Sequence, residues 1–528
     1  MKQAQVTIKE RKVQEQRAAV RSRSRTRPSQ STLLSGLSAW QWTAVAILVA
    51  AAILRLLQLT VKPLHHDEGV NGMFLTGLFR GGAYHYDPAN YHGPTLYYFA
   101  LITTTVNSLF YGKEGLSTFA IRLVTALFGM GVVWLMFCLR KQIGTQGAFF
   151  AAALATVSPG FVFFSRYFIH EILFVFFTLG VIVAWLHYWE KREPLYLFLA
   201  SASAALLCAT KETWIITVAV WLIALACTEG YFRLRGRPAV ERSLVNSESE
   251  LSTHLWVTAA AIFVAIWVVF YSSFFTNFPK GVYDSIATFG PWFKTGEQSK
   301  WVAPWYTYFS WMLQAEAPVM ILGLLGCIIA FVDARNRFAA FTAFWTLGML
   351  SAYSLVPYKT PWLVLNIVLP LIIMAGYGLQ QMFSPGLRAF TAAIAGAAVA
   401  FSLYQAIDLS FFHYDDDTKT YVYAHTTRDF LSLVNEINSI AAGRPEGKNI
   451  DIDVMSTEHW PLYWYLRDYP HAAYPGRVEE TNAPIVIALE SQQLEVARLL
   501  DGRYRLYSRH ELRPGNILYT YLRRDIQP

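Results

Sequence analysis

Residues 40–68, WQWTAVAILVAAAILRLLQLTVKPLHHDE, place a long apolar segment shortly before an acid pair that follows two histidines. The apolar part, residues 40–60, is long enough to cross a bilayer as a helix, which takes about 20 residues. Ionisable side chains held against a membrane are costly and usually have a function. The pair Asp67-Glu68 therefore predicts an active site at the membrane boundary that acts on a membrane-bound substrate.

The composition of the chain is that of a polytopic membrane protein. Of the 528 residues 54% are hydrophobic and only 15% are charged, and the mean hydropathy is +0.31. A soluble protein of this length needs more polar surface. The four cysteines all fall in apolar segments, which indicates small buried side chains rather than disulfides or metal ligands.

The net charge of +8 is explained by the N-terminal segment 1–39. Serine and arginine alternate there and aromatic residues do not interleave with them, so we expect a disordered cytoplasmic tail at anionic lipid and no nucleic-acid partner. A cleaved signal peptide is disfavoured because the apolar run that follows is too long. The basic residues are Lys2, Lys9, Arg11, Lys12, Arg17, Arg21, Arg23, Arg25 and Arg27.

The distribution of loop charges predicts about eleven spans within a transmembrane domain of residues 40–410. A twelfth apolar run, 94–111, lies in the first outer loop, 61–118. If this run lies in the membrane plane, the clustered basic loops all face the cytoplasm, as the positive-inside rule requires. We therefore expect an in-plane juxtamembrane helix here. We also expect a cell-membrane protein whose N-terminus is cytoplasmic and whose C-terminus is extracytoplasmic. The expected spans are 40–60, 119–139, 147–164, 171–189, 194–210, 213–231, 255–275, 308–332, 338–356, 362–383 and 389–408.

This topology brings several chemically rich segments to one aqueous face. They are the first loop, the turn 165–171, the turn 357–361 and the pair Lys211-Glu212. The loop 276–306 is rich in aromatic residues and predicts a surface helix or a lid.

Beyond residue 410 the mixed polar sequence 411–528 predicts a small extracytoplasmic α/β domain. The expected helices are 426–442 and 491–500, and the expected strands are 450–455, 485–489, 504–507 and 517–521.

Asp67 and Glu68 are the strongest catalytic candidates, because the loop around them is dense in histidine and tyrosine. Neighbouring residues do not share a face easily. We therefore expect one carboxylate to point into a cavity and the other to pair with a basic residue. His92, before Gly93 and Pro94, either opens the in-plane helix or contacts a metal or phosphate.

The basic candidates each have an ordinary alternative. Arg166 can close its turn by pairing with Glu171, or hold an anionic substrate in bidentate geometry. Arg122 lies near the outer end of a span, where it either snorkels or serves a buried function. Lys359, between two prolines, either anchors the chain at the interface or binds phosphate.

The order of these motifs resembles the GT-C membrane glycosyltransferases of the protein O-mannosyltransferase and aminoarabinose transferase group. The similarity is carried by the acid pair after the first span, by 92–98 (HGPTLYY), by 119–129 (FAIRLVTALFG), by 165–171 (SRYFIHE) and by 359–362 (KTPW) with Leu369-Pro370. The runs HDEG and YHGPTLYYF are most similar to the flippase-activity-associated membrane proteins of archaeal N-glycosylation. The resemblance covers roughly residues 40–410.

The resemblance implies a transferase that moves a sugar, mannose-like in the family, from a polyprenyl-phosphate carrier to a protein, lipid or glycan acceptor on the outer face. It implies a catalytic carboxylate at Asp67 with Glu68 beside it, and a divalent metal ion as the one cofactor, held by Asp67, His92 and Glu171. The sequence departs from the family at His92, where aminoarabinose transferases have Glu, and at His170-Glu171, where many relatives have Asp. The implied substrate contacts are His92, Tyr97, Arg122, Arg166, His170 and Lys359.

A non-enzymatic transporter or accessory protein for polyprenyl-linked sugars is the alternative. Such a protein needs polar residues deep in its spans, and the sequence offers few, mainly Gln314 and Glu316. Asp67→Asn separates the two hypotheses, since transport does not require a catalytic carboxylate.

Overall fold

A computed structural model describes residues 38–88, 92–236, 253–290, 302–500 and 502–526 of the chain. The chain divides into two compact units, Met1–Ala46 and Ile47–Pro528, and the contacts that form the candidate site all lie within the second. The predicted basic tail lies outside the described residues except for 38 and 39, as do the aromatic residues at 292, 293 and 301.

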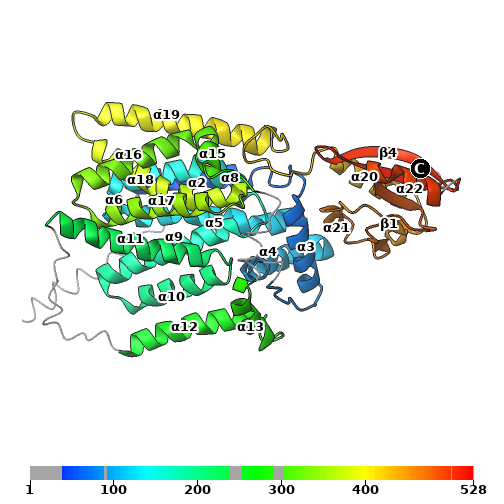
Figure 1. Ribbon diagram of the computed structural model, residues 1–528, viewed down its shortest axis with the longest axis horizontal. Coiled ribbons are helices and arrows are strands. Elements are labelled where there is room, and N and C mark those ends of the chain that lie inside the picture. Colours follow the sequence, from blue (N-terminus) through cyan, green and yellow to red (C-terminus); the bar gives the residue numbers. More distant parts are fainter. Residues whose placement is uncertain (1–37, 89–91, 237–252, 291–301, 501, 527–528) are drawn as a thin grey trace, which may run out of the picture. The chain divides into compact units, whose positions relative to one another are not determined.

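Apolar helices make up most of the described chain up to residue 412 (Figure 1). A helix is present in each of the eleven segments in which the sequence predicts a span. These helices are α2 (Ala39–Leu56), α5 (Thr118–Cys138), α7 (Thr145–Val157), α8 (Pro159–Ser165), α9 (Glu171–Lys191), α10 (Pro194–Cys208), α11 (Trp214–Leu234), α12 (Thr253–Tyr271), α15 (Thr307–Ala315), α16 (Ala317–Asp333), α17 (Arg337–Leu355), α18 (Leu365–Met382) and α19 (Arg388–Ile407).

Eight of the described helices are long and apolar enough to cross a membrane, or ten if each bent pair counts as one span. The bent pairs are α7 with α8, at 56°, and α15 with α16, at 113°. Helix α10 has 15 residues and falls short of a span by length alone. The protein is therefore a multi-span membrane protein, with a count close to the predicted eleven.

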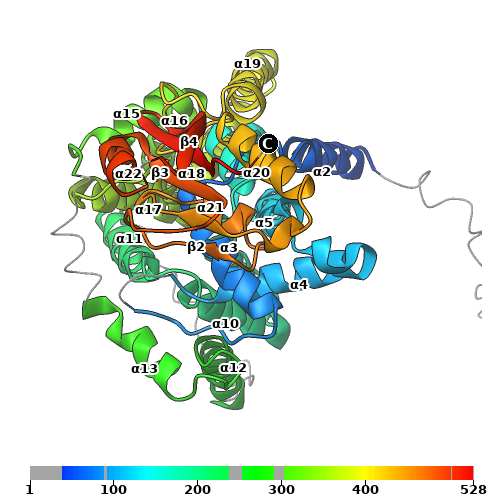
Figure 2. The ribbon, with the colours of Figure 1, turned by 90° about the vertical axis from the view of Figure 1, so that its right-hand side faces the viewer.

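Helix α18 is the central helix of the apolar part, with 94% of its apolar window buried. It packs against α16, α17 and α7, and α16, α17 and α18 lie together in both views (Figures 1 and 2). The approach to α16 needs a glycine, because a Cβ added at Gly326 would lie 1.9 Å from the carbonyl oxygen of Met374. Small residues at such crossings bring helix backbones close together, as is common in membrane proteins.

The first loop contains the helix that the sequence predicts over 94–111 and a second helix that begins at the acid pair. Helix α3 (His66–Phe79) begins at the acids, and α4 (Thr95–Tyr111) followed by η1 (Gly112–Gly115) fills the run for which an in-plane helix was expected. Three further short helices connect longer ones. These are α6 (Arg140–Ile143), α13 (Lys280–Ala287) and η2 (Pro361–Val364).

The C-terminal part forms a small α/β domain around a five-stranded sheet of order β2-β1-β3-β5-β4 (Figure 2). Strands β2, β1 and β3 are parallel, and β5 is antiparallel to both β3 and β4. Its elements are α20 (Phe430–Ala442), η4 (Gly447–Asn449), β1 (Ile452–Val454), α21 (Leu462–Tyr465), β2 (Ala472–Ala473), β3 (Ile485–Leu489), η5 (Glu490–Gln492), α22 (Gln493–Leu499), β4 (Tyr504–Arg513) and β5 (Asn516–Arg523), whereas η3 (Asp408–Phe412) continues α19.

Strand β3 is buried on both faces, which explains its unbroken apolar run. Ile485 and Ile487 lie in a cluster with Phe430 of α20, whereas Val486 and Ala488 lie in a cluster with Val496 of α22. Alternate side chains of a strand point to opposite faces of its sheet. The two helices therefore cover opposite faces. Strand β2 has only two residues, too few to give a signal in the sequence.

Candidate active site

The acid pair lies in the first turn of α3, and a reciprocal cap fixes its position. His65 precedes the helix, and its Nδ1 accepts a hydrogen bond from the Asp67 backbone N at 3.1 Å. The Glu68 carboxylate accepts one in return from the His65 backbone N at 2.9 Å. The arrangement is a capping box with histidine in the place of serine or threonine. The cap and the helix dipole both favour two carboxylates here.

Glu68 is fully buried and forms a bidentate ion pair with Arg122 of α5. Both nitrogen–oxygen distances are 2.7 Å. Arg122 gives its three remaining N–H donors to the carbonyls of Leu59, Lys62 and Pro63. Burial raises the pKa of Glu68, but the charge and hydrogen bonds of Arg122 outweigh burial and hold that pKa at about 2. All five guanidinium donors thus tie the chain that leaves the first span to α5.

Asp67 lies on the other side of this turn and is half-buried. Its pKa is raised by burial; the charges of His66, His92 and Lys211 lower it, and that of Glu171 raises it. Asp67 and Glu171 in turn raise the pKa of Tyr358, after the larger effect of burial. One carboxylate is therefore paired, and the other is acted on by ionisable groups from three distant segments, at residues 92, 171 and 211.

Three polar pairs contain the groups whose charges act on Asp67, or their direct neighbours. His92 Nδ1 lies 2.8 Å from Glu212 Oε2. His170 Nε2 lies 2.9 Å from the carbonyl oxygen of Gly93, and the rings of His92 and His170 stack edge to face with centroids 5.3 Å apart. Lys211 and Glu171 form a buried ion pair. The predicted candidates His92, His170 and Glu171 thus come together with Asp67.

The pairs differ in their exposure. The side chain of His92 is 44% exposed, whereas that of Glu212 is 4% exposed. Tyr86 adds a hydrogen bond of 2.9 Å to the second oxygen of Glu212. Burial raises the pKa of Glu212, but the charge and hydrogen bond of His92 lower it more. His92 is therefore the solvent-facing residue of a hydrogen-bonded group in which the buried Glu212 and Tyr86 hold it in place.

Tyr97 is fully buried and connects α4 to α3. Its hydroxyl donates to Asn71 Oδ1 at 2.9 Å, and Asn71 Nδ2 donates to the carbonyl of Phe168 at the same distance. Tyr97 also packs edge to face against His170, with ring centroids 5.5 Å apart. It therefore contacts the candidate site from behind.

Two predicted phosphate contacts lie at helix ends. Arg166 donates from Nη1 to the carbonyls of Leu54 and Leu57, at 3.1 and 2.7 Å, at the C-terminus of α2. Lys359 donates to the carbonyls of Tyr353, Ser354 and Val356 at the C-terminus of α17. Cations are stabilised there by the negative end of the helix dipole.

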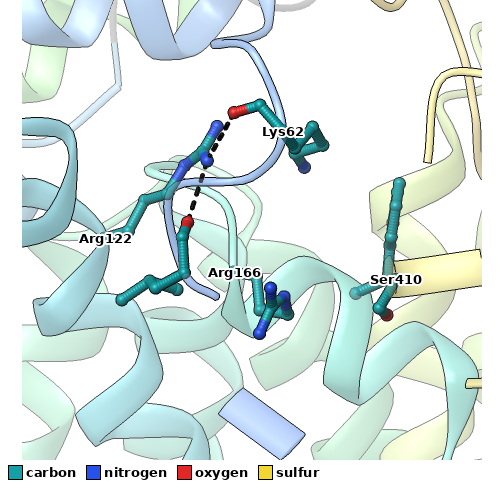
Figure 3. A pocket seen from close by; sticks show the side chains of 6 residues that line it. Lys62, Arg122, Arg166 and Ser410 are labelled. Carbon is teal, nitrogen blue, oxygen red and sulfur yellow. Dashed lines mark hydrogen bonds between the residues drawn. The ribbon is translucent and has the colours of Figure 1, made fainter. Parts of the chain in front are cut away.

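A cluster of basic residues lies close to Glu68, and one of them, Lys62, was not singled out from the sequence. Lys62, Arg122 and Arg166 line one small space with Ser410 (Figure 3), and this space has no room for a water molecule. Lys62 lies over the ring of Tyr167, at 2.9 Å from its centroid. Burial lowers the pKa of Lys62 well below its usual value, Glu68 raises it, and both arginines lower it further. In the sequence, Lys62 cannot be told apart from an ordinary lysine that anchors the end of a membrane span.

The C-terminal domain and the linker before it also reach α3. His65 Nε2 lies 3.0 Å from the carbonyl oxygen of Tyr423, and the hydroxyl of Tyr465 accepts from the backbone N of Leu64 at 3.0 Å. Arg513 Nη2 lies 3.3 Å from His66 Nδ1. No sequence signal links residues some 360 to 450 positions apart, so these contacts required the fold.

The expected metal ligands do not form a prearranged set. Among the described residues no three His, Cys, Asp or Glu side chains are close enough together to hold one ion. Glu171 is paired with Lys211, and the Nδ1 atom of His92 contacts Glu212. A divalent ion on Asp67, His92 and Glu171 therefore remains a prediction and would require these pairs to open.

Comparisons with known proteins agree on the fold. Residues 91–238 match the family model described as dolichyl-phosphate-mannose-protein mannosyltransferase. ArnT from Cupriavidus metallidurans, solved with undecaprenyl phosphate, is similar with a TM-score of 0.63 at 14% identity, over 92% of this chain and 98% of that chain. No curated protein sequence matches the chain.

The archaeal oligosaccharyltransferase AglB from Archaeoglobus fulgidus has the same fold. In complex with an inhibitory peptide and a dolichol-phosphate, it is similar with a TM-score of 0.55 at 13% identity, over 86% of this chain and 70% of that chain. The oligosaccharyltransferase solved with Zn and sulfate has a TM-score of 0.52 at 13% identity, over 89% and 73% of the two chains.

Proposed function

We propose that this chain, a membrane protein with the GT-C fold of the protein O-mannosyltransferase and aminoarabinose transferase group, transfers a sugar from a polyprenyl-phosphate carrier to an acceptor. The reaction takes place on the extracytoplasmic face, with the N-terminus in the cytoplasm and residues 411–528 outside. The observation that carries the proposal is the half-buried Asp67 at the start of α3, bordered by His92, Glu171 and Lys211.

Asp67 acts as the general base. It takes the proton of the acceptor hydroxyl while that oxygen forms a bond to the anomeric carbon of the sugar. The bond from the anomeric carbon to the phosphate oxygen breaks with inversion, and polyprenyl phosphate leaves with the bonding electrons. A positioned base of this kind contributes about 10²–10⁴-fold to the rate.

Lys211 and His92 act on the leaving group once their pairs with Glu171 and Glu212 open. Negative charge accumulates on the phosphate as its bond to the sugar breaks, and donors that are already in place stabilise it. The charges of both residues act on the carboxyl of Asp67, and His170 holds the backbone at Gly93.

Glu68, Arg122, Arg166 and Lys359 position the site. Each is engaged by protein partners, either the buried ion pair or carbonyls at helix and loop ends. We therefore propose that Glu68 and Arg122 hold the first loop, that Arg166 holds the end of α2 and that Lys359 holds the end of α17. Tyr97 supports the ring of His170.

A vesicle assay tests this function. The purified protein, reconstituted with polyprenyl-phosphate-linked sugars, is expected to release polyprenyl phosphate only when an acceptor is present, in equal amount to the glycosylated product. The matched transport assay follows movement of the same carrier between leaflets. Carrier movement without release would support the transporter alternative and contradict the enzyme.

The pH dependence of transfer gives a second test. Burial, with Glu171, raises the pKa of Asp67 against the opposing charges of His66, His92 and Lys211. Only the ionised carboxylate is a base, so the rate is expected to fall as pH falls through this raised pKa. The midpoint of the acid limb should lie above about 3.9, the ordinary aspartate value. Initial rates are measured from pH 3 to 8, with unfolding followed at each pH as the control. A midpoint below 3.9 contradicts the assignment.

A further inference from the structure

An open groove of about 450 Å³ lies between α15 and the segment that links α19 to the C-terminal domain. Its size falls within the range of about 300–1,000 Å³ that is usual for small-ligand sites. The residues that line it are Pro304, Tyr306, Thr307, Ser310, Trp311, Gln314, Pro361, Asp417, Thr418, Lys419, Thr420, Val422 and Tyr423.

One face of α15 supplies the centre of this lining. Thr307, Ser310, Trp311 and Gln314 are spaced three, one and three residues apart, which places them on one side of a helix. This stripe of polar and aromatic residues belongs to a helix pair that is apolar enough to enter a membrane. A polar face on such a helix calls for a polar occupant or water.

The side chains of the groove are held in place before any ligand binds. Trp311 packs edge to face against the buried Tyr308, with ring centroids 5.4 Å apart. Gln314 Nε2 donates to Ser310 Oγ at 3.0 Å, and Thr420 Oγ1 donates to Gln314 Oε1 at 3.1 Å. An aromatic face and fixed hydroxyl and amide groups therefore sit side by side.

The charges favour a neutral occupant. Lys419 donates to Asp408 Oδ2 at 2.6 Å, so its charge is balanced outside the lining. The remaining formal charge of the lining is the carboxylate of Asp417. Among the described residues that line the groove, a phosphate or an anionic lipid headgroup would meet no uncompensated cation.

The groove shares Tyr423 with the surroundings of Asp67, because the charge of Asp67 adds to burial in raising the pKa of Tyr423. Tyr423 lines the groove, and its carbonyl oxygen lies 3.0 Å from Nε2 of His65, two residues before Asp67. Pro361 lines it as well and directly follows the turn that carries Tyr358 and Lys359. An acceptor lying in the groove would thus extend toward the carboxylate of Asp67.

We propose that this groove binds the acceptor, and that the acceptor is an uncharged saccharide whose ring stacks on Trp311 while Ser310, Gln314 and Thr420 bind its hydroxyl groups. This rests on the proposed function. A sugar ring has an apolar C–H face, which suits an aromatic surface, and hydroxyls at its rim, which suit hydroxyl and amide partners. An extended peptide instead needs a row of backbone partners such as a strand edge, and none of the five strands of the sheet lines the groove.

Two measurements on the full-length reconstituted protein test the proposal. The first titrates methyl glycosides of neutral manno- and gluco-oligosaccharides and follows tryptophan fluorescence, which does not depend on turnover. The second measures the KM for an oligosaccharide acceptor and the KM for the lipid-linked donor. Trp311→Ala is the test variant. Phe309→Ala is the matched control, because Phe309 is an exposed aromatic residue of the same helix that does not line the groove.

We expect saturable oligosaccharide binding that Trp311→Ala weakens about tenfold, the loss of one stacked ring. The KM for the acceptor should rise by a similar factor while the KM for the donor stays constant, and Gln314→Ala should act in the same direction. Unchanged acceptor affinity in Trp311→Ala, or competition by neutral peptides and not by oligosaccharides, overturns the proposal.

The result also separates this proposal from the function on which it rests. Transfer without saccharide binding in the groove overturns the acceptor assignment and leaves the transferase intact. Saccharide binding that Trp311→Ala weakens, in a protein that transfers no sugar, overturns the transferase and leaves a saccharide site.

Discussion

Replacing Asp67 by Asn should lower the rate of sugar transfer at least about a hundredfold, since the amide cannot accept the proton of the acceptor hydroxyl. The loss is expected in kcat, with little change in the KM for the donor. Asn has nearly the same shape as Asp, and Asp67 is half-buried without an ion pair among the described residues. Folding should therefore be preserved. The measurement is product formation in reconstituted vesicles under saturating donor.

Two controls make the result specific to Asp67. Asp451→Asn replaces an exposed carboxylate of the C-terminal domain and should leave the rate unchanged. Unfolding curves of Asp67→Asn and the unchanged protein should coincide. If Asp67→Asn turns over at the unchanged rate, Asp67 is not the base.

Replacing Glu68 by Gln should reduce the free energy of unfolding by about 3–5 kcal/mol, the cost of leaving one partner of a buried pair uncompensated. The variant strands Arg122 with no counter-ion, beside the buried Lys62 and Arg166. Denaturant unfolding in detergent micelles measures the loss. The exposed pair of Arg80 and Asp468 is the matched control, and Arg80→Gln should cost less than about 1 kcal/mol.

The same pair predicts how stability changes in acid. The pKa of Glu68 is about 2 in the folded protein and about 4.3 in an unfolded chain. Its contribution is therefore complete above about pH 4.3 and is lost as pH falls toward 2. The double variant Glu68→Gln with Arg122→Gln should lose less than the sum of the single losses, because neither charge is then stranded. Additive losses would contradict a direct pair.

Most of the fold follows from patterns along the chain. Apolar length predicts the helices at all eleven expected spans, and the helix of the first outer loop, now α4, lies one residue from the predicted start. Alternation and turn residues predict four of the five strands. The break between α15 and α16 was not expected, although Pro318 in the first turn of α16 is a sequence signal for the start of a helix.

The site follows from the sequence only in part. The motifs point to Asp67, His92 and Glu171, and the charges of His92 and Glu171 act on Asp67 in the structure. They do not reveal that Arg122, Arg166 and Lys359 turn toward backbone carbonyls, because a guanidinium or ammonium near a membrane has the same signature whether it binds a lipid phosphate or a helix end.

The sequence by itself determined that this is a multi-span membrane protein with an acid pair beside its first span, because hydrophobic length and charge are properties of local segments. Only the tertiary structure decided which acid is paired. Glu68 meets Arg122 across 54 residues of chain, and Asp67, about 100° away around the helix, lies on a different side. The groove along α15 likewise exists only in the folded protein, because its two walls are about 100 residues apart in the sequence.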